Sequence, residues 1–174
     1  MKKLFLSAIA LMMVMNVNAQ KYLNSSGTPF EEGKFYVGAS LSGLGVNYSK
    51  ASKWSLGLQA KAGYLFLDNW MVLGVLSYNN QSEGSAITTN IGAGARYYFD
   101  QIGIYAGLTA KYAHFKVSGV NGTSDFRPEI YGGYAFFLSH YVTLEPEIYY
   151  EHSFKDTDYS GFGLRLDVVF IFSS

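Results

Sequence analysis

Apolar and polar positions alternate strictly in the last segment of the chain, residues 161–172. One parity is wholly apolar, and the other holds glycines and two opposite charges, Arg165 and Asp167. Because a β-strand has a period of two, this pattern predicts a strand with one apolar and one polar face. The segment exceeds the roughly 5–6 residues of an average strand and suits a tilted, membrane-spanning one. The apolar stripe consists of Phe162, Leu164, Leu166, Val168, Phe170 and Phe172.

The same alternation recurs along most of the chain. The predicted strands are residues 34–48, 54–67, 70–79, 86–99, 102–116, 126–138, 141–153 and 159–172. Tight turns at 68–69, 100–101 and 139–140 alternate with longer polar loops near 49–53, 80–85, 117–125 and 154–158. Short turns at one end and longer loops at the other are typical of a membrane barrel. We therefore predict an all-β fold, an eight-stranded antiparallel up-and-down transmembrane β-barrel with both termini at the short-turn end.

Two of these segments fit the alternation poorly. In residues 34–48 the phase blurs after Gly43, which indicates a β-bulge. Residues 70–79 are apolar on both faces, so the pattern leaves the facing of this strand open.

The N-terminus has the features of an export signal. Lys2 and Lys3 precede an apolar run, and small residues lead to a cleavage site before Gln20. The run is short for a membrane span, so residues 1–19 are predicted to be a cleaved signal peptide. Residues 20–33 form a short, mostly polar lead-in, and residues 34–172 form the barrel. The chain has no cysteine, and an exported chain without disulfides favours a bacterial envelope.

Charge is balanced overall and concentrated on one strand face. The formal net charge is zero, which gives no reason to expect nucleic-acid binding. A charge facing lipid at mid-membrane costs about 2–4 kcal/mol, so charges on the polar parity are expected to point inward and to pair. This predicted network consists of Lys61, Arg96, Lys111, Arg127, Glu129, Glu145, Glu147, Glu151, Arg165 and Asp167.

Counting from the short turns sorts the network into two layers, each neutral in sum. The upper layer holds Lys111, Arg127, Glu129 and Glu151, and the other six residues lie lower. The pair favoured across the last hairpin is Glu147 with Arg165. An eight-stranded barrel is about wide enough for its own side chains to fill it, which favours a structural core. A gated polar path is the alternative.

No motif for catalysis or for cofactor binding stands out. HExxH, CxxC, phosphate-loop and nucleophile-elbow patterns are absent from the sequence. Glu151, His152 and Ser153 suggest a hydrolase, but strand neighbours point to opposite faces, so His152 and Ser153 should diverge. The acidic pair at 156–158 is far from a full calcium loop. We therefore expect no catalytic, cofactor or metal residues.

The signal ending in NAQ, the alternating strands, the DNW turn at 68–70 and the closing GLRLDVVFIF carry a resemblance. The chain resembles the small eight-stranded outer-membrane β-barrel family typified by OmpX and the OmpA barrel, in the style of Bacteroidetes-type bacteria. The resemblance implies a monomer in the outer membrane with periplasmic termini, in contact with lipids and lipopolysaccharide. It also implies periplasmic chaperones and the barrel assembly machinery, which recognises an aromatic-ended last strand. In this chain two serines follow Phe172, which is a slight departure from that pattern.

The family resemblance implies a structural or surface-contact role, in envelope integrity or adhesion, without enzymatic activity. A narrow channel for small or hydrophobic solutes and a lipid A-modifying enzyme are the alternatives. The rival fold is a soluble, lipocalin-like barrel, which would place apolar residues inside and polar residues outside.

Overall fold

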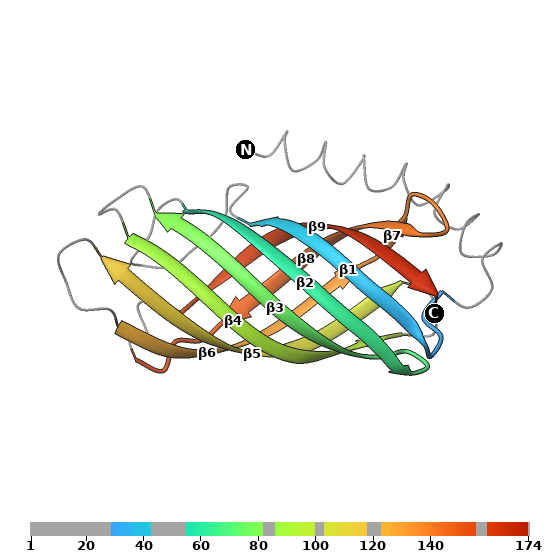
Figure 1. Ribbon diagram of the computed structural model, residues 1–174, viewed down its shortest axis with the longest axis horizontal. Coiled ribbons are helices and arrows are strands. Elements are labelled where there is room, and N and C mark those ends of the chain that lie inside the picture. The colour runs from blue at the N-terminus through green and yellow to red at the C-terminus, as the bar shows by residue number, and fades with distance from the viewer. Residues whose placement is uncertain are drawn as a thin grey trace.

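A computed structural model of the chain describes residues 29–42, 55–81, 86–99, 103–117, 123–155 and 160–173. Its strands wrap around a single axis as one tilted barrel (Figure 1). Their bounds are β1 Lys34–Ser42, β2 Ser55–Leu67, β3 Trp70–Gln81, β4 Ala86–Tyr98, β5 Ile104–Val117, β6 Thr123–Tyr134, β7 Phe136–Phe137, β8 Val142–Glu151 and β9 Gly161–Ser173. No helix within these ranges has the length and hydropathy needed to cross a membrane.

Every strand pairs antiparallel with its neighbours, and the sheet closes on itself. The order is β6-β5-β4-β3-β2-β1-β9-β8-β7, and β6 also pairs with β8. The first and last strands pair from Lys34 opposite Ser173 to Ser42 opposite Arg165. Along the residues that this ladder joins, closure leaves no free sheet edge. The predicted all-β, antiparallel barrel is confirmed.

Strands β6 and β7 follow one another along a single strand position of the barrel, here called a stave. The nine strands therefore make eight staves. The pairing of β8 with Gly133 and with Phe136 keeps one register on both sides of the interruption. That register places Pro146 opposite Tyr134, where proline has no N–H to donate to the ladder. The chain nevertheless stays beside β5, because the Ala135 N–H donates to the Gly103 carbonyl at 2.8 Å.

One predicted loop is wrong in its extent. Residues 117–125 were expected to form a loop, whereas β5 continues to Val117 and β6 begins at Thr123. Aspartate has low strand propensity, and the cross-strand pairing of residues 123–125 with β5 overrides it here. As a result Asp125 lies in a strand and points inward. The signal peptide and the bulge after Gly43 lie outside the described residues.

The predicted turn at 68–69 is present and follows an unpredicted bulge. The β2–β3 register shifts between Leu65 and Leu67. The shift leaves Phe66 and Leu67 both exposed on the outer surface. Asn69 completes the turn with a φ of 66°, a left-handed conformation that asparagine tolerates.

The barrel is polar inside and apolar outside, the reverse of a soluble barrel. Strand β3 now has a definite facing, with Met71, Leu73 and Val75 buried in the lumen. Its neighbouring residues Trp70 and Val72 are exposed on the outer surface. Apolar side chains are likewise exposed on the other staves, and charged side chains are buried. This arrangement excludes the lipocalin-like alternative.

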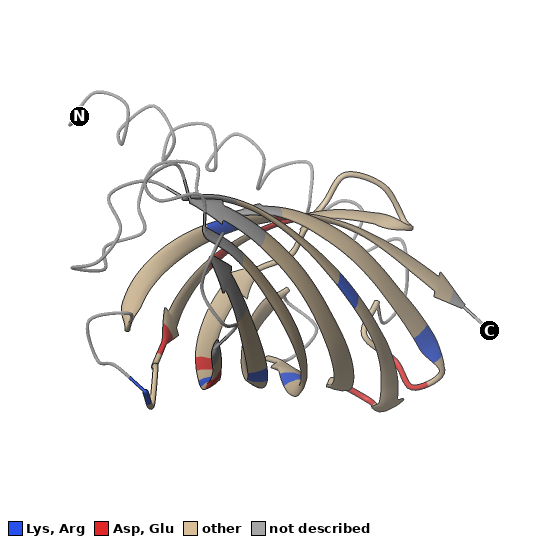
Figure 2. Ribbon diagram, turned by 60° about the vertical axis from the view of Figure 1, so that its left-hand side comes forward, with Lys and Arg blue, Asp and Glu red and all other residues tan. Residues whose placement is uncertain are grey.

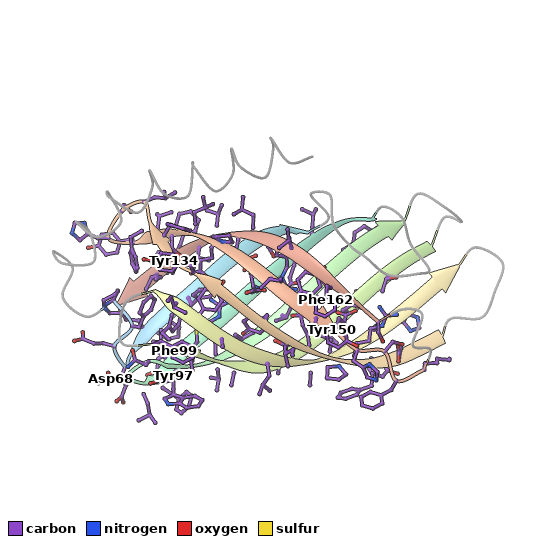
Figure 3. All side chains as sticks on the ribbon, turned by 180° about the vertical axis from the view of Figure 1, so that it is seen from behind. Asp68, Tyr97, Phe99, Tyr134, Tyr150 and Phe162 are labelled. Atoms are coloured by element: carbon purple, nitrogen blue, oxygen red, sulfur yellow. The ribbon has the colours of Figure 1, made fainter. Side chains whose placement is uncertain are left out.

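Aromatic rings gather toward both ends of the outer surface (Figure 3). Toward the short-turn end, the Tyr97 ring lies 4.9 Å from Trp70 and 5.2 Å from Phe99 between centroids. Toward the other end, Tyr150 and Phe162 lie 4.7 Å apart. Paired rings at these two levels match the aromatic girdles of membrane barrels.

One aromatic ring near the short-turn end is largely buried. Phe136 is only 5% exposed and packs against Tyr134 with ring centroids 4.5 Å apart. It therefore does not join the exposed belt.

Inside the barrel, glycines accommodate large rings on the neighbouring stave. Gly107 lies opposite Tyr131, and Gly133 lies opposite Tyr105. A Cβ on Gly107 would overlap the Tyr131 ring and lie 2.7 Å from the Ala95 carbonyl oxygen. The glycines thus give the tyrosines the space they need in a narrow lumen.

The glycine at 107 should therefore be intolerant even of alanine. We expect Gly107→Ala to lower the free energy of unfolding by about 1–3 kcal/mol, because the ring must shift in a filled interior. Gly74→Ala is the matched control, since its Cβ would meet only the Ala62 carbonyl oxygen at 3.9 Å. Urea unfolding midpoints in detergent micelles measure both, and equal midpoints for the two variants would contradict tight packing at Gly107.

Candidate functional site: the interior charge network

Few positions along the strands are charged (Figure 2). The ten charged residues predicted for the lumen lie on β2, β4, β5, β6, β8 and β9. Each of the ten is buried except Glu151, which is partly buried. The apolar stripe of β9 points the other way, and its six side chains are exposed. The alternation of a single strand thus separates the lipid-type surface from the lumen.

Glu147 on β8 is the centre of the lower part of the network. Its carboxylate accepts from Lys61 Nζ at 3.1 Å, from Arg96 Nη2 at 3.2 Å and from Arg165 Nε at 2.8 Å. Tyr105 adds a hydroxyl donor at 3.3 Å. Glu147 and Arg165 are direct partners in the β8–β9 register, which places them together as the sequence suggested.

Arg96 is fully buried in a cage of tyrosines. Its Nη1 donates to Glu145 at 2.8 Å and to the hydroxyls of Tyr36 and Tyr98 at 3.1 Å each. The guanidinium carbon lies 4.0 Å from the centroid of the Tyr105 ring and 5.3 Å from that of Tyr131. Ring faces attract a cation, so the cage compensates part of the desolvation of the charge. These rings were not predicted to be part of the network, although most share the parity of the charges.

Arg165 connects the two predicted layers into one network. Besides Glu147, its Nη2 binds Glu129 at 2.9 Å. Glu129 also pairs with Lys111 at 2.5 Å, and Lys111 reaches Glu151 at 3.1 Å. The layers are therefore continuous rather than separate. A continuous set of pairs can satisfy more of its buried donors and acceptors than two isolated layers could.

Asp125 is a member of the network that the sequence did not predict. Its Oδ2 accepts from Arg127 Nε at 2.8 Å and from Ser153 Oγ at 2.6 Å, and its Oδ1 accepts from the Lys155 N–H at 3.2 Å. With Asp125, the described network has one more anion than its five cations. The signal in the sequence was the shared parity with Arg127, hidden by the assignment of residues 117–125 to a loop.

Below the charges, the short-turn mouth is filled by apolar and aromatic side chains. Phe30 of the lead-in is fully buried there and packs with Tyr98 and Phe137, in a cluster that includes Leu65 and Ile171. The lead-in was expected to be only a polar connection, because one phenylalanine in a polar segment gives no periodic signal.

The candidate catalytic residues at the outer end are kept apart. Ser153 is 1% exposed, and its hydroxyl donates to Asp125 in the lumen. His152 lies among outer rings, with its centroid 5.0 Å from that of Phe154 and 6.4 Å from that of Tyr150. His152 Nδ1 lies 3.3 Å from Ser160 Oγ. The pair suggested by the sequence is therefore not a nucleophile with its base.

The glycine-rich GAGAR segment, residues 92–96, lies within strand β4 and does not form a phosphate loop. Gly92 and Gly94 lie opposite Lys111 and Thr109, where added Cβ atoms would meet these residues. The two glycines therefore make space in the lumen. The acidic pair at 156–158 is outside the described residues. The described part of the chain contains no cluster of three or more potential metal ligands.

The closed barrel, apolar outer face and charged lumen together define the fold of the small eight-stranded outer-membrane β-barrels. Solved structures with this fold include Neisserial surface protein A, with 14% identity, a TM-score of 0.58 and coverage of 79% of this chain and 95% of that one. Ail of Yersinia pestis in a phospholipid bilayer nanodisc has 17% identity, a TM-score of 0.57 and coverage of 81% and 100%.

The N-terminal β-barrel domain of Pseudomonas aeruginosa OprF is a third, with 17% identity, a TM-score of 0.54 and coverage of 81% and 98%. No protein-family model matches the chain, and no curated protein matches it. At these identities the likeness concerns the fold alone.

The Glu147 carboxylate should be the least replaceable group of the network. We expect Glu147→Gln to lower the free energy of unfolding by about 3–5 kcal/mol, because this fully buried carboxylate serves three cations at once. Each cation then keeps a single carboxylate, Asp167 for Lys61, Glu145 for Arg96 and Glu129 for Arg165. Glu151→Gln, on the same strand, is the control. Its side chain is 16% exposed, and Lys111 and Arg127 keep Glu129 and Asp125, so a loss of about 1–2 kcal/mol is expected. Denaturant titrations in micelles compare the two, and equal losses would show that Glu147 is not central.

Proposed function

We propose that the chain is an integral outer-membrane protein with a structural or surface-contact role and no enzymatic activity. The observation that carries the proposal is the combination of an exposed apolar surface around the barrel with a lumen filled by paired charges. An apolar belt of this kind is stable only against lipid. We propose outer-membrane lipids and lipopolysaccharide as its surroundings, with both termini in the periplasm.

Assembly would follow from the same surface. The last strand presents its exposed apolar stripe along its length, from Phe162 to Phe172. We propose that periplasmic chaperones and the barrel assembly machinery recognise this strand and that the product is a monomer. The closed ladder supports a monomer, since the described first and last strands pair with each other rather than with a second copy.

A surface-contact role has support among the structural neighbours. One is named a surface protein, and Ail is named the attachment invasion locus protein, with one structure in complex with the heparin analogue sucrose octasulfate. These names belong to those proteins. For this chain they favour a role in contact between the outer surface and its surroundings over solute transport.

The contacts in the lumen weigh against the channel alternative. Arg165 joins Glu129 on one side to Glu147 on the other, and Arg96 is enclosed by tyrosines. A solute would have to break several buried ion pairs to pass this level, each costly to separate. For the enzyme alternative, the Ser153 hydroxyl that the sequence placed beside His152 donates instead to Asp125 in the lumen, and the hydroxyl next to His152 is that of Ser160.

Conductance of the Arg165→Met variant separates the structural role from a channel. In planar lipid bilayers we expect neither the wild type nor the variant to conduct, because methionine fills the space although the ion pairs are lost. We expect the variant to be less stable by about 3–5 kcal/mol. Leu166→Met, on the outer face of the same strand, is the control and should change neither property. A variant that stays as stable as the wild type but conducts would favour the channel.

A further inference from the structure

The segment just before β1 lies at the short-turn end of the barrel, where β9 ends and the β2–β3 turn is found (Figure 1). Phe30 has no exposed surface. Its ring stacks on Tyr98 with centroids 3.7 Å apart and planes at 10°, and it lies 5.7 Å from the Phe137 ring. Tyr98 belongs to β4 and Phe137 to the β6–β7 stave. The phenylalanine therefore reaches from the start of β1 to staves on the other side of the lumen.

Backbone contacts fasten this segment to the β2–β3 turn. The Phe30 carbonyl accepts from the Asn69 N–H at 2.8 Å, and the Gly33 N–H donates to the Leu65 carbonyl at 2.8 Å. The Glu32 N–H donates to the Asp68 carboxylate at 2.9 Å. Gly33 has a φ of 89°, a conformation that glycine adopts without strain. These contacts therefore hold the segment in a fixed position against the β2–β3 turn.

The same segment takes no part in closing the barrel. The β1–β9 ladder begins at Lys34 opposite Ser173, and the β1–β2 ladder begins at Phe35 opposite Tyr64. Both ladders stay complete if residues 29–33 leave the mouth. These local contacts form a small unit that can open by itself, whereas the strands of the barrel open only together.

We propose that residues 29–33 are a plug that seals the short-turn mouth and can open without unfolding the barrel. The Phe30 ring excludes water from the mouth, and the Asp68 carboxylate holds the segment on the β2–β3 turn. Opening exposes the lower lumen as far as the level of Glu145 and Arg96, where the ion pairs form a second barrier. This device goes beyond the proposed function, and its test does not depend on adhesion, lipid contact or conductance.

A cysteine reporter below the charges tests the plug, because the natural chain has no cysteine. Val169 is fully buried in the apolar cluster of the mouth, and cysteine is close to valine in size. We expect Val169→Cys in micelles to react slowly with a water-soluble maleimide. Adding Phe30→Ala should speed the reaction by about tenfold or more, since labelling follows the population of the open state.

Three controls make the result specific. Phe35→Ala removes an outward aromatic ring nearby and should leave the labelling of Val169→Cys unchanged. Ser77→Cys reports on the upper lumen and should not respond to Phe30→Ala. Retained heat-modifiable gel mobility shows that the barrel is still folded.

Substitution of Asp68 gives an independent variant in case Phe30→Ala does not fold. Asp68→Ala removes the acceptor for the Glu32 N–H on the exposed turn, keeps Phe30, and should speed labelling by a smaller factor. The plug is overturned if Phe30→Ala folds and labels no faster. It is equally overturned if Phe30→Ala unfolds the barrel and Asp68→Ala leaves the rate unchanged, because the segment would then be part of the barrel's fold.

Discussion

The shared carboxylate of Glu147 is the contact on which the rest of the molecule depends. It meets Lys61, Arg96 and Arg165, which come from β2, β4 and β9, so it ties distant staves together across the lumen. Burying these cations without an anion would cost several kcal/mol each. The narrow lumen of an eight-stave barrel leaves little space for water, and the charges must therefore satisfy one another. Tyrosines around Arg96 and glycines opposite the rings follow from the same shortage of space.

The outer surface follows from the inner one through the period of the strand. A residue next to an inward charge must point outward, where the structure places Leu164, Leu166 and Val168 beside Arg165 and Asp167. Shifting β9 by one residue would place charges against lipid and leucines in the lumen, so register is strongly fixed. Closure pairs the first strand with the last, so the apolar belt continues across that seam.

Alternation alone was sufficient to predict the eight staves, their antiparallel order and the facing of seven of them. It failed where another interaction decides the outcome. The lumen face of β3 is apolar at Met71, so the alternation did not show which face of this strand points inward. The pairing of β3 with β2 and β4 decides its orientation. Asp125 was missed because its neighbours resemble a loop. Phe30 was missed because its burial depends on Tyr98 and Phe137, which lie far away in the sequence. The level at which Arg165 meets Glu129 depends on barrel stagger, which no local pattern encodes.

The environment of alternate positions in lipid tests the two-faced barrel most directly. Single nitroxide labels at Leu166 and Val168, which face outward, are compared with labels at Ser40 and Ser77, which face the lumen. In bilayers, we predict frequent collisions of the outer labels with oxygen, which partitions into lipid, and few with a water-soluble nickel complex. The lumen labels should collide rarely with oxygen. Outer labels that meet the nickel complex as freely as an exposed loop does would contradict an apolar face against lipid around a charged, filled lumen.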